Sequence, residues 1–299
     1  NALNGVSLAL KKGETLGVVG ESGCGKSTLA RCIVRLYTPQ RGRITYHGQD
    51  IFAADARDDR SYNRRVQMMF QDPYSSLNPR MTTGQILSEA LRVHQMRPNS
   101  HIDARVAELL ELVRLPQDAA GKLPHEFSGG QRQRIAIARA LAVEPEVLIA
   151  DEPVSALDVS VQAQVVNLLL ELQERLNLTI LFVAHDLRLV RHVSHRVAVI
   201  YLGRIVEIGD SETLFARPAH PYSQALLSAA PSLDPDDKGR AIHLAGELPS
   251  PMDVPSGCPF HLRCPHATEI CKRDVPALTA HQGRGEVACH HVNETNTHA

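Results

Sequence analysis

One stretch near the start of the chain limits its possible folds more than any other. Residues 20–28 read Gly-Glu-Ser-Gly-Cys-Gly-Lys-Ser-Thr and fit the pattern G-x-x-x-x-G-K-[ST]. A largely apolar run, residues 15–19, precedes the pattern, and apolar residues at helical spacing follow it. The context is therefore strand, loop and helix, in which backbone N–H groups and the positive helix end form a nest for phosphate. The stretch predicts a nucleotide-binding loop.

Each residue type in this loop has a physical task. Glycines let the backbone turn its N–H groups inward, Lys26 can reach the β- and γ-phosphates, and the Ser27 hydroxyl can bind Mg²⁺. The side chain of Cys24 is interpreted as incidental, because the backbone binds the phosphate. Many classes of protein share this loop, so it does not identify the function by itself. The predicted nucleotide-binding residues of the loop are Gly20, Glu21, Ser22, Gly23, Cys24, Gly25, Lys26, Ser27 and Thr28.

The composition narrows the choice of partners. The 299 residues are 22% charged and 43% hydrophobic, which is typical of a water-soluble protein with an ample core. A net charge of −1 argues against a dedicated nucleic-acid binder. No apolar run approaches the roughly 20 residues of a membrane span, and no signal peptide is evident. The chain opens without Met, almost directly on the predicted strand of residues 6–10, and looks trimmed at the front.

The order of predicted strands and helices indicates an α/β fold with a largely parallel sheet. A helical insert of about residues 72–142 interrupts it, with a predicted capping box at Ser100 and an apolar stripe beginning at Ile102. Beyond about residue 210 prolines become frequent, which predicts a loop-rich extension. We therefore expect a nucleotide-binding domain over residues 1–215 and a small extension with four cysteines over residues 216–299.

Two further motifs can act on a nucleotide. The predicted strand of residues 147–150 ends in Asp151, which can hold Mg²⁺, and Glu152, which can activate water as a general base. Alone, these acids would more simply be solvated carboxylates at a strand end. Ser128 begins a second glycine-bearing helix start, either a plain capped helix or a second anion site. A dimer could use both sites, with each nucleotide held between two chains.

With these motifs the chain resembles the nucleotide-binding subunits of ABC transporters over roughly residues 1–210. The resemblance implies a P-loop ABC ATPase fold, with a mixed sheet core and a helical subdomain. Phe127 departs from the usual pattern, in which Leu precedes the signature. The matching motifs, in the family's order, are the Q-loop Gln71, the signature Ser128-Gly129-Gly130-Gln131, Walker B Asp151-Glu152, the D-loop of residues 155–158 and the switch histidine His185.

The resemblance implies a role for each matching residue. Lys26 and Thr28 contact phosphates, Ser27 and Asp151 hold Mg²⁺, and Gln71 senses Mg²⁺ and the attacking water. Glu152 is the catalytic base, and His185 contacts the γ-phosphate. Taken singly, His185 could be an ordinary residue at a helix start and Gln71 a polar residue at a strand end. The signature residues that reach the nucleotide of the opposite subunit are Ser128, Gly129, Gly130 and Gln131. Asp158 lies at the dimer seam.

Other stretches are similar to the oligopeptide/dipeptide importers: residues 71–80, 220–227, 246–251 and 256–261. Residues 74–77 and 130–134 resemble the F-type ATPase subunit of these importers. This similarity implies ATP hydrolysis that powers peptide import, at the cytoplasmic face of the membrane. The implied partners are a second, different ATPase subunit, two permease subunits and, indirectly, an extracytoplasmic binding protein, with no nucleic acid. The aromatic residue that stacks on adenine in the family lies upstream of the chain's start, so ATP is inferred from the resemblance.

Alternatives remain at this point. An importer of the same type could carry a nickel chelate or a glycoside instead of a peptide. A soluble ABC-type ATPase acting on nucleic acid is disfavoured, because only one short helical insert separates Lys26 from Asp151. A cluster-based sensor with a vestigial ATPase is disfavoured by the intact set of Lys26, Asp151, Glu152 and His185.

The extension carries four cysteines with the spacing C-x₅-C-x₆-C-x₁₇-C. Metal ligation is preferred over disulfides, because ATP use implies the cytosol. Related importer subunits with this tail carry a [4Fe–4S] cluster, which makes that cluster the first expectation. Zn²⁺ is the second, with His261, His266 or His290 as substitute ligands, and free structural thiols are the third. The expected ligands are Cys258, Cys264, Cys271 and Cys289.

Overall fold

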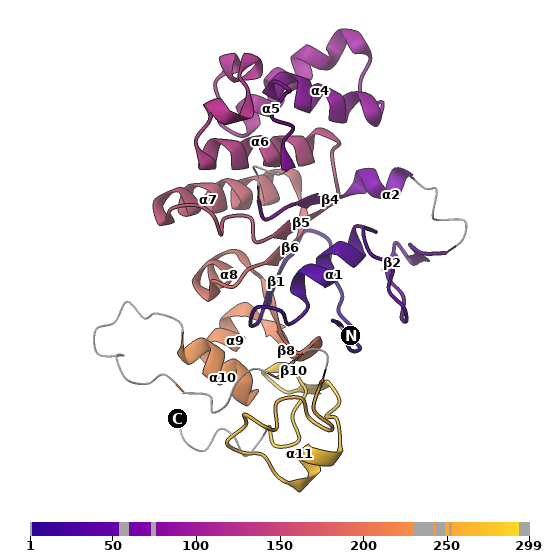
Figure 1. Cartoon of the computed structure of the whole chain (residues 1–299), viewed down its shortest axis with the longest axis vertical. Helices are drawn as coiled ribbons and strands as arrows, with labels where there is room; N and C mark the ends of the chain where they lie inside the picture. Colours follow the sequence, from indigo (N-terminus) through magenta and orange to yellow (C-terminus); the bar gives the residue numbers. More distant parts are fainter. Residues whose placement is uncertain are drawn as a thin grey trace. The chain divides into compact units, whose positions relative to one another are not determined.

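The computed structural model describes residues 2–53, 60–72, 76–229, 242, 249–250 and 253–292. The chain forms two compact units of mixed α/β structure (Figure 1). The described residues of 1–10, 14–31 and 182–299 form the first unit, and those of 11–13 and 32–181 form the second. Parts of the importer-like stretches, residues 73–75, 246–248 and 251, lie outside the described residues.

The first unit is organised around β1 (Thr15–Val19), whose five residues are all buried. β1 pairs in parallel with β7 (Arg196–Tyr201), and β8 (Arg204–Asp210) turns back antiparallel to β7. β10 (Gly285–Val287) pairs antiparallel with β8, and β9 (Thr279–His281) pairs with β10. The strands of this unit therefore follow the order β1-β7-β8-β10-β9, and the last two come from the end of the chain.

Side-chain caps define where several helices of the first unit begin. Asp186, Asp210 and His220 each accept a backbone N–H bond from the first turn of the helix that follows. Such caps satisfy donors that the helix itself leaves without a partner. The described helices of this unit are α1 (Lys26–Ile33), whose last two residues belong to the second unit, α8 (Leu187–Val193), α9 (Ser211–Ala216), α10 (Pro221–Ser228) and α11 (Glu269–Arg273).

The second unit contains a parallel pair, β4 (Val66–Met69) and β5 (Val147–Asp151). β6 (Thr179–Val183) is fully buried, and the boundary between the two units falls within it. A short hairpin is formed by β2 (Thr45–Tyr46) and β3 (Gln49–Asp50). The predicted strands of residues 66–70, 147–150 and 179–183 are thus confirmed within one residue at each end.

The helices of the second unit pack through apolar stripes. The five residues of the predicted stripe on α5 are at most 5% exposed: Ile102, Val106, Leu109, Leu110 and Val113. The helices are α2 (Arg60–Arg65), α4 (Thr83–Val93), α5 (Ile102–Leu112), α6 (Gly129–Ala142) and α7 (Val159–Leu176). Three 3₁₀ turns connect them: η1 (Asn99–His101), η2 (Gln117–Gly121) and η3 (Pro124–Glu126).

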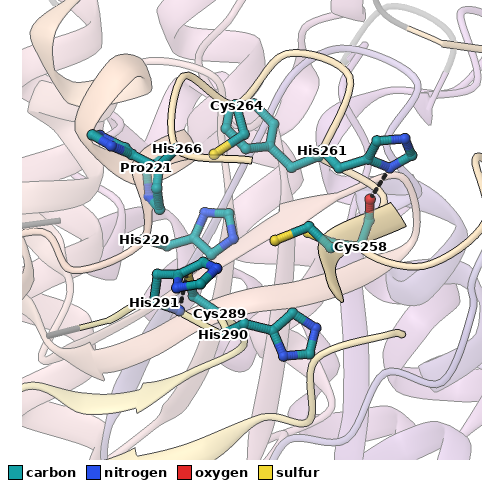
Figure 2. Close-up of a pocket in the computed structure, with 11 residues that line it drawn as sticks. His220, Pro221, Cys258, His261, Cys264, His266, Cys289, His290 and His291 are labelled. Carbon is teal, nitrogen blue, oxygen red and sulfur yellow. Dashed lines mark hydrogen bonds between the residues drawn. The ribbon is translucent and has the colours of Figure 1, made fainter. Parts of the chain in front are cut away.

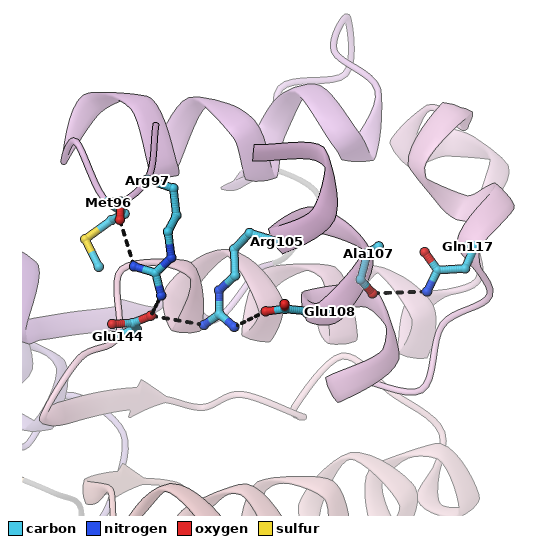
Figure 3. A network of polar contacts seen from close by, with 7 residues as sticks. All are labelled: Met96, Arg97, Arg105, Ala107, Glu108, Gln117 and Glu144. Carbon is cyan, nitrogen blue, oxygen red and sulfur yellow. Dashed lines mark hydrogen bonds and ion pairs between the residues drawn. The ribbon is translucent and has the colours of Figure 1, made fainter. Parts of the chain in front are cut away.

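A polar network holds the segment after α4 and helix α5 to the turn that follows α6 (Figure 3). The Glu144 carboxylate forms ion pairs with the guanidinium groups of Arg97 at 2.6 Å and Arg105 at 3.4 Å. Arg105 also forms an ion pair with the Glu108 carboxylate at 2.8 Å. Each exposed pair contributes only about 0–1 kcal/mol, so the network chiefly orients these segments on the apolar core beneath them.

Two local predictions are wrong. Residues 6–10 form no strand, although their side chains alternate in exposure. Ser100 does not cap α5, because η1 precedes that helix and His101 occupies the N-cap position without a side-chain bond. The extension is also more regular than expected, since β9 and β10 add two strands to the sheet of the first unit. Among the described residues, no helix is both long and apolar enough to cross a membrane.

Candidate nucleotide site and cysteine cavity

The predicted phosphate loop lies in the first unit, between β1 and α1. Gly23 and Gly25 adopt φ angles of 80° and 107°, which side-chain-bearing residues rarely adopt. The ammonium group of Lys26 is buried and donates to the carbonyl oxygens of Gly20 at 2.8 Å and Glu21 at 3.0 Å. The strand, loop and helix context that the sequence predicted is therefore present.

The other polar groups near this loop are also held in place. Glu21 lies in the loop, and its carboxylate is bound by Arg263, a residue of the extension. The thiol of Cys24 is 1% exposed, and burial raises its pKa. This thiol therefore stays protonated, in keeping with an incidental side chain.

His185 also belongs to the first unit. It is exposed and lies between the end of β6 and the start of α8. The next residue, Asp186, caps α8 by accepting the Arg188 N–H at 2.9 Å. The geometry around His185 is thus what an ordinary helix start would show, and a catalytic role for it stays a prediction.

The second unit places two of the predicted catalytic side chains in contact. Gln71 follows β4, and its amide donates to the carboxylate of Glu152 at 2.8 Å. Asp151 ends β5 and is 3% exposed. Glu152 has a φ of 47°, in the left-handed region that few residues other than glycine adopt. Backbone strain of this kind is frequent at functional sites, because the surrounding structure must hold it in place.

The predicted signature begins α6 as expected. Ser128 accepts the Gln131 N–H at 3.3 Å, and the Gln131 side chain accepts the Ser128 N–H at 2.9 Å, which together form a capping box. A Cβ atom on Gly129 would lie 3.0 Å from Leu157, and one on Gly130 would lie 2.4 Å from Val161. Both glycines therefore allow α6 to approach the D-loop segment and the start of α7.

The D-loop continues from Glu152. The Ser155 hydroxyl donates to the Glu152 carbonyl at 3.2 Å. Asp158 is exposed and is the N-cap residue of α7, where its carbonyl accepts from Val161 and Gln162. The second unit therefore contains the predicted Q-loop, signature, Walker B and D-loop residues, while the first contains the phosphate loop and His185.

All four cysteines of the extension line one small cavity in the first unit. Figure 2 shows three of them, Cys258, Cys264 and Cys289, around this space together with His220 and His291. None of the four forms a disulfide. The chain thus gathers four thiols that are up to 31 residues apart in the sequence.

Burial favours the neutral form of the thiols in this cavity. Burial raises the pKa of the Cys258 and Cys264 thiols to about 11, so they ionise at neutral pH only against a cation. Burial also raises the pKa of the Cys289 thiol, and the backbone N–H bond from His291 to its sulfur at 3.4 Å offsets this only in part. Within the described part of the chain, no group of three or more Cys, His, Asp or Glu side chains stands in position to hold a metal ion. The thiols share a cavity without converging on one point.

Two of the candidate substitute ligands are already engaged. His261 bonds to the Cys258 carbonyl through Nδ1 at 2.8 Å, and His290 bonds to the Asp274 carbonyl through Nε2 at 3.0 Å. Each keeps its other ring nitrogen for a ligand. His266 is exposed and, like the other two, lines the cavity.

Comparison with known proteins decides the family. The profile of the ABC transporter family matches residues 3–155, about half of the chain. This chain belongs to the ABC transporter family. The profile described as "Oligopeptide/dipeptide transporter, C-terminal region" matches residues 206–271 of this ABC subunit. This ABC subunit is also 53% identical over 292 residues to the oligopeptide transport ATP-binding protein AppF of Bacillus subtilis. The match covers 97% of this chain and 89% of that protein.

Solved structures support the same fold. The ABC subunit resembles cbiO1 of Clostridium perfringens, part of the ABC transporter complex cbiONQ, with a TM-score of 0.65 and 31% identity over 72% of this chain and 84% of that one. It also resembles a dimeric ATP-binding cassette in a post-hydrolysis state bound to ADP and Pi. That match has a TM-score of 0.61 and 29% identity over 70% and 90% of the two chains. The predicted fold, an ABC ATPase with a helical subdomain, is confirmed.

Sequence reasoning missed the partners of Glu21. The available signal was the acidic side chain itself, because its charge repels a phosphate ligand less when a cation lies nearby. The cation is Arg263, which is separated from Glu21 by 242 residues.

Proposed function

We propose that this chain is the ATP-hydrolysing subunit of a membrane importer for peptides. The match of its C-terminal region to the oligopeptide/dipeptide transporters carries the proposal. The 53% identity to an oligopeptide transport ATP-binding protein supports it. The F-type assignment from residues 74–77 and 130–134 is part of the same proposal.

In this proposal the phosphate loop binds ATP. Lys26 and Thr28 contact its phosphates, the backbone N–H groups of the loop hold them, and Ser27 with Asp151 and Gln71 provides oxygen ligands suited to Mg²⁺. The metal, when bound, neutralises charge on the β- and γ-phosphates. The burial of Lys26 among loop carbonyls supports this assignment, because it holds the ammonium group at the loop itself.

Glu152 is the proposed general base and Gln71 its positioning partner. The 2.8 Å bond from the Gln71 amide fixes one carboxylate oxygen of Glu152. The second oxygen can then accept a proton from water attacking the γ-phosphate. His185 would stabilise charge on the transferred phosphoryl group.

The signature residues Ser128 to Gln131 would act on the nucleotide of a second ATPase subunit, with Asp158 at the seam between the two. Three of these residues, Ser128, Gln131 and Asp158, are exposed, which supports contact with another chain. We propose that this partner is a different subunit, that two permease subunits complete the importer, and that a binding protein delivers the peptide. The chain would thus lie peripherally at the cytoplasmic face of the membrane. The part of the helical insert around residues 73–114 would meet the permease, within an ATPase domain of residues 1–215.

The cysteine cavity is proposed to hold a [4Fe–4S] cluster on Cys258, Cys264, Cys271 and Cys289. Four cysteines that line one cavity supply the four thiolate ligands that a [4Fe–4S] cluster takes. Iron and acid-labile sulfide should be found in protein purified without oxygen. Stoichiometric zinc without sulfide would exclude the cluster.

The catalytic assignment is tested by Glu152→Gln. This variant should bind ATP as the wild type does but lose roughly 100-fold or more of its hydrolysis rate, since general bases contribute about 10²–10⁴. Glu174→Gln, an exposed change on α7, is the matched control and should keep the wild-type rate. Normal hydrolysis by Glu152→Gln would show that another group activates the water.

The cargo is tested separately. Tagged chain is purified from membranes of its source, and the co-purifying chains are identified. Permease subunits should be present, and ATP hydrolysis by the assembly should rise with a peptide-loaded binding protein. Stimulation by a nickel chelate or a glycoside, and not by peptides, would overturn the peptide assignment.

A further inference from the structure

Glu21 is the second residue of the phosphate loop, and each of its polar groups has a partner. Its N–H donates to the hydroxyl of Tyr222 at 2.9 Å, and its carbonyl accepts from Lys26 at 3.0 Å. Its carboxylate receives three contacts from the guanidinium of Arg263, at 2.9, 3.2 and 3.2 Å. All four residues belong to the first unit. We call Glu21, Tyr222 and Arg263 the loop clasp.

The carboxylate of Glu21 presents an electrostatic problem to a phosphate ligand. A negative charge in a loop that binds a polyanion weakens binding unless a cation compensates it. Arg263 supplies that cation through a bidentate pair, the strongest geometry for arginine and carboxylate. The side chains of Arg263 and Glu21 are only 10% and 27% exposed, so solvent screens the pair less than it screens a surface pair.

An aromatic cluster fixes the position of Arg263. Its guanidinium lies 6.0 Å from the centre of the Tyr201 ring. The rings of Tyr201, Tyr222 and Phe260 pack against one another at 4.6 to 5.5 Å, and none is more than 1% exposed. Because Arg263 is already ordered by these rings, little conformational freedom remains to be lost when the loop binds its ligand.

We propose that Arg263 and Tyr222 are positioning residues for ATP, through which the C-terminal extension sets the affinity of the phosphate loop. Arg263 neutralises Glu21, and Tyr222 holds the Glu21 backbone in the conformation that the loop requires. The inference rests on the proposed function only in taking ATP as the ligand of this loop. It does not depend on the cargo or on the content of the cysteine cavity.

The decisive experiment is a double-mutant cycle on the full chain. Mg-ATP affinity is measured by titration for wild type, Arg263→Gln, Glu21→Gln and the double variant. Arg263→Gln should weaken ATP binding ~10-fold, the effect of one uncompensated nearby charge at intermediate screening. Adding Glu21→Gln should restore the affinity to within ~3-fold of wild type, because the uncompensated charge is then removed.

Two further readouts separate charge compensation from a merely structural role. The defect of Arg263→Gln should shrink as the salt concentration is raised, and KM for ATP should rise while kcat stays within ~2-fold of wild type. Arg273→Gln, an exposed change on α11 that removes the same charge from the extension, is the matched control and should bind ATP normally. Tyr222→Phe keeps the ring and removes the acceptor, and should weaken ATP binding ~3- to 10-fold, the usual range for one lost hydrogen bond.

The outcomes are distinguishable. If the wild type binds ATP and Arg263→Gln binds it equally well, the clasp inference is wrong and the importer function is untouched. A double variant as weak as Arg263→Gln, or weaker, would also overturn it, because loss of packing and not charge would then explain the defect. A wild type that binds no ATP would overturn both.

Discussion

Replacing Gly130 by alanine offers a direct measure of how closely the signature helix approaches α7. The added Cβ would lie 2.4 Å from a Val161 methyl carbon, whereas ordinary contacts begin at 3.4 Å. Valine is branched at Cβ and has one strongly preferred rotamer in a helix, so it cannot rotate out of the way. The two helices must therefore separate by about 1 Å, or the side chain must leave its rotamer.

The expected size of the effect follows from two opposing contributions. Overpacking of a core usually costs about 1–3 kcal/mol. Replacing glycine by alanine in a helix stabilises the helix by up to about 1 kcal/mol. We therefore expect Gly130→Ala to lower the free energy of unfolding by about 1–2 kcal/mol. Urea titration followed by circular dichroism measures this change.

Two other glycines calibrate the measurement. Gly121→Ala meets nothing within 4 Å and should change the free energy of unfolding by at most about 0.5 kcal/mol. Gly129→Ala meets only the flexible end of Leu157 at 3.0 Å and should fall between the two. Adding Val161→Ala to Gly130→Ala should restore more than half of the lost stability. If Gly130→Ala is as stable as Gly121→Ala, or if Val161→Ala gives no rescue, the close approach of α6 and α7 is not real.

Two other substitutions probe local structure. Thr82→Ala removes the capping box with Gln85 at the start of α4 and should lower the free energy of unfolding by about 1 kcal/mol. Ser100→Ala is the control, because no cap forms there, and should cost about 0.5 kcal/mol or less in the same urea titration. Equal effects of the two would contradict the cap assignment. Glu207→Ala leaves the buried N–H groups of Ala219 and His220 without their acceptor and should lower the free energy of unfolding by about 2–4 kcal/mol. Glu286→Ala, an exposed change, is its control and should lower that free energy by about 0.5 kcal/mol or less. A small loss for Glu207→Ala would mean that water or another group replaces the carboxylate.

Short-range patterns predicted what short-range physics determines. The phosphate loop and the Ser128 cap depend on residues within a few positions of one another, and the structure contains both. The alternation of residues 6–10 was misleading, because a strand also needs a partner and the pattern does not supply one. The pairing of β10 with β8 joins segments about 80 residues apart, and β10 is too short to show a period.

The candidate site also has features that local sequence predicts and features that only the fold shows. Each motif could be located by its residue types, but the bond between Gln71 and Glu152 spans 81 positions and required the fold. The left-handed backbone of Glu152 has no signal in its side chain at all. Arg263 carries no motif, and its function depends on the loop it reaches.

The distance between Glu21 and Arg263 along the chain also has a consequence for biosynthesis. The loop leaves the ribosome before its arginine partner, which follows 242 residues later. At synthesis rates of about 5–20 residues per second, that interval lasts roughly 12–50 s. During this time the nascent phosphate loop carries an unpaired acidic group and lacks its tyrosine acceptor. The growing chain should therefore reach its full nucleotide affinity only after Arg263 has been synthesised and has folded onto the loop.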